Sequence, residues 1–282
     1  LSFSTKVDFT GLKLDDMNGD IAIYDARYSN TRGEVSTKNI ALNVSNENKQ
    51  RKIKLHSSFV DASVEGSGSY ADLFSKVKSI VAQHITTIPQ DKKKNLQVPN
   101  FKVTVDVKNL NNIFALLQPK LNIAPGTKCE AVYKKESESC EISVQSPLLS
   151  YNNVNLYKCR MNGDIAAGGI HVDLKGMLDS ASNNVDLTGS VIRDSVILNA
   201  GWNYNSVLQT FGNLKIDGKM QTKKIGEMPK LFFTVNPSTM SINDSLWNIG
   251  KSSIVVDTTS ISMTDVSLFQ NDKKIMVDGV IS

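Results

Sequence analysis

The stretch LFFTVNPSTMSINDSLWNIGKSSIVVDTTSISMTDVSLFQNDKKIMVDGVIS, residues 231–282, decides the fold class. Apolar residues alternate with polar ones in short runs, as at Ile254 and Val256. Side chains on a β-strand point alternately to its two faces, so each run predicts a strand with one apolar and one polar face. Asn, Asp, Ser, Thr and Gly, which favour turns, separate the runs. The stretch therefore predicts successive antiparallel strands.

Two changes of phase interrupt this alternation. One lies between Met263 and Val266, and the other lies between Phe59 and Ala62. Side chains alternate between the two faces of a strand. One extra residue therefore puts the later apolar side chains back on the same face as the earlier ones. We therefore expect a β-bulge at each place, the first of them near Thr264 and Asp265.

Most of the remaining chain alternates in the same way, so the sequence predicts an all-β protein. The six letters MNGDIA occur at residues 17–22 and again at 161–166. Asn-Gly between alternating apolar residues is typical of a two-residue hairpin turn. The sequence therefore predicts hairpin turns at both Asn-Gly pairs, within an antiparallel sheet that meanders along the chain.

Two segments have helical rather than strand periodicity. Apolar residues at helical spacing, with Ser69 and Asp72 as a capping pair, predict an amphipathic helix near residues 69–86. A short helix is expected near 109–118. The first helix either caps an apolar groove or packs over the end of the sheet, and we favour the second interpretation. Residues 86–100 contain Pro89 and Pro99 and predict a mobile connector.

A five-residue pattern of apolar, polar, apolar, polar and Gly recurs along the strands. Its six copies occupy residues 7–11, 62–66, 172–176, 185–189, 214–218 and 275–279. The glycine always lies on the apolar face of the predicted strand. Glycines bend designed sheets, so the pattern fits a curved sheet that is apolar on its concave side. It equally fits strands of a β-sandwich that end at glycine turns.

Composition excludes several classes of protein. The 282 residues include 32 basic and 28 acidic ones, a net charge of +4, and the basic residues form only short runs at 49–52, 92–94 and 273–274. A nucleic-acid-binding protein would need a basic stripe with interleaved aromatic residues, so we expect no nucleic-acid partner. No apolar run is long enough for a membrane helix. Because the chain starts and ends within predicted strands, we expect it to be one segment of a longer protein.

The reactive side chains form no catalytic or metal-binding motif. Cys129, Cys140 and Cys159 contain no CxxC pair, and the predicted hairpin places Cys140 opposite Tyr133, so we expect three free thiols. Phosphate-binding, hydrolase, zinc and calcium motifs are all missing from the sequence. We therefore expect a protein that is not an enzyme and that uses neither a cofactor nor a metal ion.

Several stretches resemble the TamB family, the translocation and assembly module proteins of Gram-negative bacteria. The similarity is clearest at residues 237–249, PSTMSINDSLWNI, and continues at 254–257 and 277–279. Upstream, the similar stretches are FTGLKLDDMNGD at 9–20, FVDASVEG at 59–66, LLQPKLNIAPGT at 116–127 and SPLLSYN at 146–152.

The resemblance implies both a fold and a function. TamB-like proteins are periplasmic, anchored in the inner membrane, and related to AsmA-like and bridge-like lipid transfer proteins. Residues 1–282 would then form a single continuous segment of an elongated, curved antiparallel sheet with an open apolar groove, into which residues 69–100 are inserted. The groove would bind phospholipid and conduct it between the inner and outer membranes.

Two alternative functions remain open. The segment could be a scaffold for assembly of outer-membrane β-barrel proteins, with a TamA-like barrel as its partner, or a surface-exposed β-sandwich that binds a ligand. Under the lipid interpretation, the apolar positions of the predicted strands line the groove. These positions are Val7, Phe9, Leu42, Val64, Val103, Val105, Val144, Leu174, Val185, Leu187, Leu198, Trp202, Leu214, Ile216, Ile242, Ile254, Val256, Ile261 and Met263.

Overall fold

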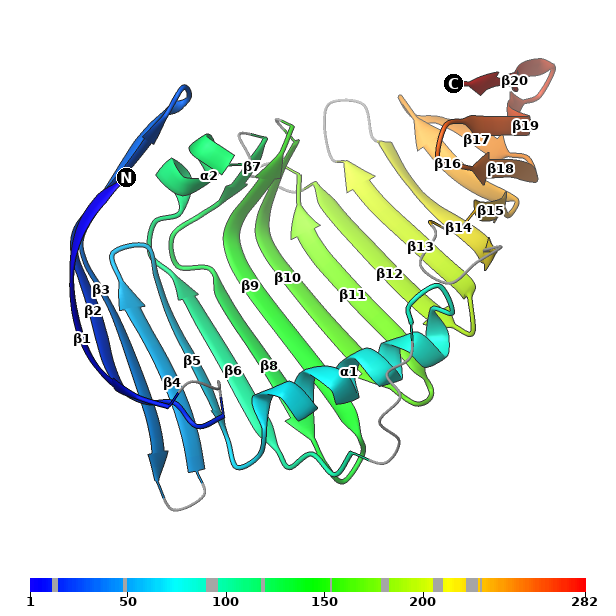
Figure 1. The fold of residues 1–282 in the computed structure, drawn as a ribbon. Coiled ribbons are helices and arrows are strands. Elements are labelled where there is room, and N and C mark those ends of the chain that lie inside the picture. The colour runs from blue at the N-terminus through cyan, green and yellow to red at the C-terminus, as the bar shows by residue number, and fades with distance from the viewer. Residues whose placement is uncertain are drawn as a thin grey trace. The chain divides into compact units, whose positions relative to one another are not determined.

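The prediction of an all-β protein is confirmed. The computed structural model describes residues 1–11, 15–47, 50–89, 96–117, 120–152, 154–178, 183–204, 210–221, 228 and 230–282. Strands account for 70% of the residues and helices for 8%, and the strands belong to one antiparallel sheet (Figure 1). The expected groove and curvature stay predictions.

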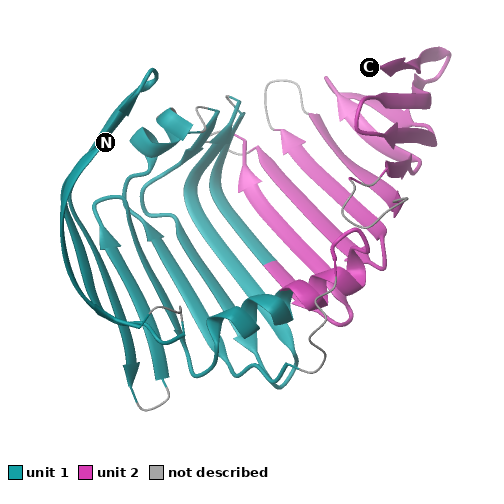
Figure 2. Ribbon diagram, in the orientation of Figure 1, with its two compact units in different colours: residues 1–77, 93–162 teal, residues 78–92, 163–282 magenta. Residues whose placement is uncertain are grey.

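The chain forms two compact units (Figure 2). Unit 1 contains residues 1–77 and 93–162, and unit 2 contains residues 78–92 and 163–282. Strand β10 (Val154–Ala166) and helix α1 (Tyr70–His84) each begin in unit 1 and end in unit 2. Each unit is described separately below, and the expected single continuous segment stays a prediction.

In unit 1 the strands follow one another across the sheet in the order β1, β2, β3, β4, β5, β6, β8 and β9. Strand β7 pairs with the far end of β9. The bounds are β1 Ser2–Thr10, β2 Asn18–Asn30, β3 Gly33–Glu47, β4 Gln50–Ser57, β5 Val60–Gly66, β6 Phe101–Val107, β7 Leu121–Ile123, β8 Lys128–Lys134 and β9 Ser139–Tyr151.

In unit 2 the main order is β11, β12, β13, β14, β15, β18, β19 and β20. The β16–β17 hairpin joins it by pairing with β14 and β19. The bounds are β11 Gly169–Met177, β12 Asn184–Ile192, β13 Ser195–Tyr204, β14 Thr210–Gln221, β15 Lys230–Val235, β16 Ser238–Ile242, β17 Ser245–Ile249, β18 Ser252–Val256, β19 Ile261–Gln270 and β20 Lys273–Ile281.

Both predicted helices are present. Helix α1 begins where expected, because the Ser69 hydroxyl accepts a hydrogen bond from the Asp72 amide at 3.1 Å. The Asp15 carboxylate reinforces this cap by accepting bonds from the Tyr70 amide and the Ser69 hydroxyl. Helix α2 (Asn111–Leu117) corresponds to the short helix predicted over 109–118, of which residue 118 lies outside the described residues. Neither helix is long and apolar enough to cross a membrane.

The predicted turns at the two Asn-Gly pairs are wrong. Asn18 and Gly19 already belong to β2, and the described part of that turn is Asp15 and Asp16. The second pair lies inside β10, and the chain turns five residues later, immediately before Gly169. Gly169 has a φ of 153°, which glycine adopts without strain, so this site competes successfully with Asn-Gly.

Of the two predicted bulges, one is confirmed. The β19–β20 register shifts between Met263 and Val266, and Asp265 has a φ of 57°. The other phase change, between Phe59 and Ala62, is instead a hairpin turn between β4 and β5. The Ser57 hydroxyl accepts hydrogen bonds from the amides of Phe59 and Val60, so a turn replaces the bulge.

The connector after α1 is packed rather than mobile at its C-terminal end. Its residues 90–95, including the basic run at 92–94, lie outside the described residues. Val98 is only 2% exposed, and Pro99 lies against Gly68. Pro99, one of the two prolines on which the prediction of mobility rested, therefore lies next to a buried residue. The predicted cysteine arrangement is confirmed, because Cys140 lies opposite Tyr133 and none of the three cysteines forms a disulfide bond.

Candidate functional site

The register of unit 1 places apolar residues in rows across the sheet. Residues directly opposite one another on antiparallel strands share a face, so successive pairs can be followed from β1 to β9. One row consists of Val7, Ile21, Leu42, Leu55, Ala62, Val105, Cys129 and Val144. The neighbouring row consists of Phe9, Gly19, Val44, Ile53, Val64, Val103, Ala131 and Ile142.

Unit 2 has rows of the same kind. The longest consists of Ile170, Val191, Val196, Gly218, Phe233, Ile254, Met263 and Gly279. A second consists of Val172, Gly189, Leu198, Ile216 and Val235. A third consists of Gly176, Val185, Trp202, Gly212, Met240 and Trp247. We call this side of the strands the apolar face of each unit.

All 19 residues predicted to line a groove lie on these apolar faces. The seven at Val7, Phe9, Leu42, Val64, Val103, Val105 and Val144 lie together on unit 1. The other twelve lie together on unit 2. The alternation therefore assigned each side chain to its face correctly.

Within each unit, the described strands form a single layer. No second sheet packs against these residues inside either unit. None of the 19 is buried: Val7, Leu187, Leu198 and Ile261 are exposed and the others are half-buried. Leu187 and Leu198 are each 39% exposed. Contiguous apolar surface of this kind is uncommon on soluble proteins and marks sites of interaction.

The predicted groove residues did not include further members of the same rows. They include Ile21, Val44, Ile53, Leu55, Ala131 and Ile142 in unit 1, and Val172, Val191, Val196, Phe233, Met240 and Trp247 in unit 2. Several of these residues do belong to alternating runs, so that signal alone would have found them.

Two of the recurring glycines, Gly66 and Gly218, have a role that neither initial interpretation included. A side chain at Gly66 would collide with the Phe101 ring, and one at Gly218 would come within 2.7 Å of Phe233. Each aromatic residue lies directly opposite its glycine on the next strand. Aromatic side chains that cover a cross-strand glycine compensate for its missing packing. These glycines therefore make room for large side chains on the apolar face.

Helices lie at the strand ends of unit 1. At one end, the Tyr70 ring of α1 packs on Phe101 with a centroid distance of 5.7 Å. At the other end, α2 packs against β3 and β7, and its Leu116 lies next to Gly33 (Figure 1). We call these the α1 end and the α2 end. The favoured interpretation of the first helix, packing over strand ends, agrees with these contacts.

In unit 2 the C-terminal half of α1 is fixed by polar contacts. His84 is buried, and its Nε2 lies 2.8 Å from the Ala166 carbonyl oxygen. The Asp194 amide donates to the His84 carbonyl, while the Asp194 carboxylate accepts bonds from the amide and hydroxyl of Thr86. The helix is therefore held at two hairpin turns of this unit.

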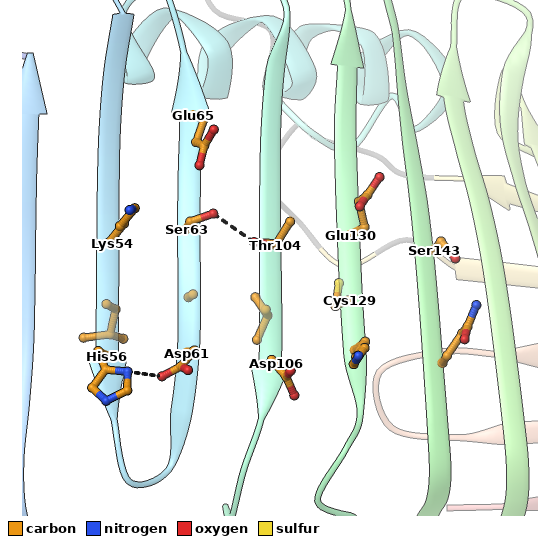
Figure 3. Close-up of a pocket in the computed structure, with 15 residues that line it drawn as sticks. Lys54, His56, Asp61, Ser63, Glu65, Thr104, Asp106, Cys129, Glu130 and Ser143 are labelled. Atoms are coloured by element: carbon orange, nitrogen blue, oxygen red, sulfur yellow. Dashed lines mark hydrogen bonds and ion pairs between the residues drawn. The ribbon is translucent and has the colours of Figure 1, made fainter. Parts of the chain in front are cut away.

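The opposite face of unit 1 is polar and carries a shallow hollow. The hollow has a volume of about 710 Å³ and crosses β4, β5, β6, β8 and β9 (Figure 3). Most of its lining residues carry hydroxyls, amides or charges of both signs, with Ser63 and Thr104 hydrogen-bonded at 2.8 Å. Leu55, Ala62, Val105 and Cys129, from the first apolar row, line it as well. Ion pairs such as Lys52–Glu65 and Lys102–Glu130 balance the charges on this face. This balance is typical of a solvated sheet face.

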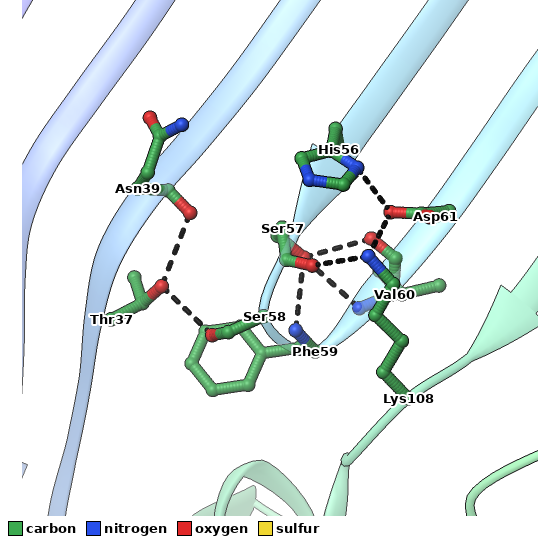
Figure 4. Close-up of polar contacts among 9 residues, drawn as sticks. All are labelled: Thr37, Asn39, His56, Ser57, Ser58, Phe59, Val60, Asp61 and Lys108. Carbon is green, nitrogen blue, oxygen red and sulfur yellow. Dashed lines mark hydrogen bonds and ion pairs between the residues drawn. The ribbon is translucent and has the colours of Figure 1, made fainter.

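One charged cluster lies at the edge of this hollow (Figure 4). Asp61 Oδ1 lies 2.8 Å from His56 Nδ1 and 2.7 Å from Lys108 Nζ. The hydrogen bond from Lys108 is the main reason that the pKa of Asp61 is lowered, and it outweighs the opposing effect of partial burial. The carboxylate therefore stays ionised, which suits a structural anchor at the β4–β5 turn better than a proton carrier.

Four other side chains, two thiols and two phenols, have a raised pKa and provide no nucleophile. Burial raises the pKa of the Cys129 and Cys159 thiols and of the Tyr70 and Tyr133 hydroxyls, so all four stay protonated. Within the described ranges, no group of three His, Cys, Asp or Glu side chains could hold a metal ion. The apolar face is therefore the strongest candidate site.

Compared with known proteins, the chain matches no family model, no curated protein and no solved structure.

Proposed function

We propose that the apolar faces of both units bind the acyl chains of phospholipids. The observation that supports this most directly is the set of apolar rows, in which all 19 predicted positions stay exposed or half-buried. A water-facing apolar surface of this extent favours an apolar ligand. Each methylene transferred from water to such a surface contributes up to about 0.8 kcal/mol, so a tail could bind without any polar contact.

The proposal extends to the setting of the protein. The stretches that resemble TamB-like proteins support a role in carrying phospholipid between the inner and outer membranes. In this proposal the chain works in the periplasm as part of an inner-membrane-anchored protein with a TamA-like barrel partner. The meandering antiparallel sheet agrees with the fold that the resemblance implies.

Charges placed on the apolar face test the proposal. Leu187→Asp and Leu198→Asp put carboxylates on neighbouring strands at positions already 39% exposed, so the variants are expected to fold. Thr188→Asp and Asn199→Asp are matched controls, because these exposed residues pair with each other on the other face of the same strands. We expect lipid binding to be lost only in the first pair.

The native tryptophans provide the readout. The chain has two, Trp202 and Trp247, and both lie on the apolar face of unit 2. Phospholipids with brominated acyl chains should quench their emission, and the apolar-face aspartates should abolish this quenching. Equal quenching of both variant pairs would contradict the proposal. A scaffold that pairs with nascent barrel strands through its backbone would instead tolerate charges on either face.

A further inference from the structure

Strand β20 lies at the edge of unit 2 and is exposed along its whole length. Among the described strands it pairs with β19 alone, so the backbone groups along its other side have no partner strand there. All nine of its residues are exposed. An edge strand offers its free backbone groups to a strand of another chain, and proteins usually protect such edges with charges or bulges. Strand β20 is therefore a candidate interface.

Strand β20 is apolar on both faces. Ile275 and Val277 lie on the apolar face of unit 2, because they alternate in step with Gly279 of the longest row. We call the other side of these strands the reverse face. Met276 and Val280 lie on the reverse face and are 50% and 66% exposed. An exposed apolar strand at the edge of a sheet is a site of association with another chain.

The edge strand of unit 1 differs in this respect. In the described chain, β1 pairs with β2 alone. Its apolar residues Val7 and Phe9 share one face, and the residues that alternate with them are Lys6, Asp8 and Thr10. Strand β1 therefore has one polar face that favours contact with solvent, whereas β20 is apolar on both.

The exposed apolar surface continues from β20 across the reverse face of unit 2. Phe269 of β19 is the diagonal neighbour of Met276 on this face. Leu246 of β17 and Phe211 of β14 follow, one on each side of Ser241. Phe211, Leu246 and Phe269 are all exposed. An interface at β20 would therefore be extended by apolar side chains.

The sequence of β20 is complementary to itself in an antiparallel pair. Residues 274–278 read KIMVD. When Met276 lies opposite Met276 of a second copy, Lys274 lies opposite Asp278 in both directions, and Ile275 lies opposite Val277. Residues directly opposite each other share a face. Opposite charges therefore meet on the reverse face, and apolar side chains meet on the apolar face.

Only this register pairs the charges. The next registers that keep the faces matched put Asp278 opposite Met276 or opposite Asp272 of the second copy. Asp278 Oδ1 accepts a bond from the Asp265 amide at 2.5 Å, and its second oxygen can accept one from Lys274 of the second copy. Exposed ion pairs add little affinity, but they select the register and the partner.

We infer that two copies of this chain associate by antiparallel pairing of their β20 strands about a two-fold axis at Met276. A two-fold contact closes on itself, so it gives a dimer rather than a fibre. The apolar faces of the two copies then lie on the same side of the joined sheet. This inference goes beyond the proposed function and does not depend on it, because the oligomeric state alone decides it.

Charge reversal tests the pairing. K274D brings two carboxylates together at each charge pair, and D278K brings two ammonium groups together. Sedimentation velocity should show a dimer for the unaltered protein and a dissociation constant at least about tenfold higher for either variant. In an equimolar mixture of the two variants, opposite charges meet again at both pairs, so the dimer should return. K215D is the control, because Lys215 is exposed on the reverse face of β14, away from β20.

Three results would overturn the inference. They are an unaltered protein that stays monomeric, a dimer that both K274D and D278K leave intact, and a mixture of the two variants that associates no better than either alone. Quenching by brominated phospholipid, measured on the same preparations, decides the proposed function separately.

A cysteine at the two-fold axis tests the register without changing a charge. M276C should form an intermolecular disulfide under mild oxidation, because opposite residues of antiparallel strands have Cα atoms about 4.5–5.5 Å apart. K273C is the control, since this register places the two copies of Lys273 about 20 Å apart along the strands. Equal crosslinking of M276C and K273C, or none of M276C, would overturn the pairing.

Discussion

The two units share one strand pattern but differ in how they cover their apolar faces. Of the buried apolar residues in the described chain, ten belong to unit 1 and four to unit 2. Two of those four, Ile80 and Ala82, belong to α1 rather than to the strands. Unit 1 therefore fills part of its own face with large side chains and helices, whereas the described strands of unit 2 bury only two apolar residues, Val235 and Ile249.

The glycine–aromatic pairs show the same difference on a smaller scale. Gly66 lies under Phe101, which is 2% exposed, while Gly218 lies under Phe233, which is only half-buried. The sequence pattern is identical at the two places, and the surroundings are not. Similar strands therefore carry a buried aromatic ring in one unit and a half-buried one in the other.

The largest expected effect is the loss of Phe101. Phe101→Ala removes a buried ring that contacts Tyr70 and fills the space over Gly66, so unit 1 should lose about 3–5 kcal/mol of unfolding free energy. Leu198→Ala, on the open face of unit 2, should lose about 1 kcal/mol. Urea unfolding followed by circular dichroism measures both values.

Tryptophan emission separates the units in the same experiment, because both tryptophans belong to unit 2. If Phe101→Ala shifts the dichroism midpoint and leaves the emission midpoint unchanged, the units unfold independently. Equal losses for Phe101→Ala and Leu198→Ala would remove the distinction between a packed and an open face.

The second prediction compares the two glycines. Gly66→Ala places a methyl group against a ring that cannot move, which should cost about 1–3 kcal/mol. At Gly218→Ala the Phe233 ring can swing toward the open face, so the cost should stay below about 1 kcal/mol. Gly279→Ala is the control, since nothing lies within 4 Å of the added carbon. Thermal unfolding of the three variants ranks their losses of stability. Equal losses for Gly218→Ala and Gly66→Ala would contradict the prediction.

The third prediction concerns the anchor of α1 in unit 1. Asp15 accepts bonds from Ser69 and Tyr70 and pairs with Arg51 at 2.8 Å, so Asp15→Asn should cost about 0.5–2 kcal/mol. Partial burial opposes ionisation of Asp15, but these two hydrogen bonds and the Arg51 charge together lower its pKa. The anchor should therefore be fully effective above about pH 4, where the unfolded carboxyl is ionised, and weaken as the pH falls through the lower folded pKa.

Urea midpoints measured from neutral to acid pH check this dependence. The wild-type protein should lose stability more steeply than Asp15→Asn at the acid end, since the variant has no carboxyl to protonate there. Parallel curves for the two proteins would show that Asp15 does not anchor the helix. In unit 2 the corresponding contact is that of Asp194 with Thr86, which Asp15→Asn leaves intact.

Much of this arrangement could be predicted from the sequence, and the exceptions have physical reasons. A strand period of two assigns each side chain to a face without any knowledge of its neighbours, so all 19 predicted face residues share a face within their unit. Register and turn position depend on the partner strand, and for this reason the turns at Asn18 and Asn162 were placed wrongly. Burial of Val98 and the exposure of Phe74 depend on tertiary packing that local sequence does not encode.

The smallest expected effects lie on the polar faces. Asp61 of unit 1 contacts both His56 and Lys108, and its side chain is 40% exposed, so solvent screens much of the attraction. Asp61→Asn should therefore cost no more than about 1 kcal/mol, and the cost should shrink in about 1 M salt. In unit 2 the corresponding pair, Lys175 and Asp186, is longer at 3.9 Å and more exposed. Asp186→Asn should leave the urea midpoint unchanged. A large loss of stability at either aspartate would contradict the conclusion that solvent screens the charges on both polar faces.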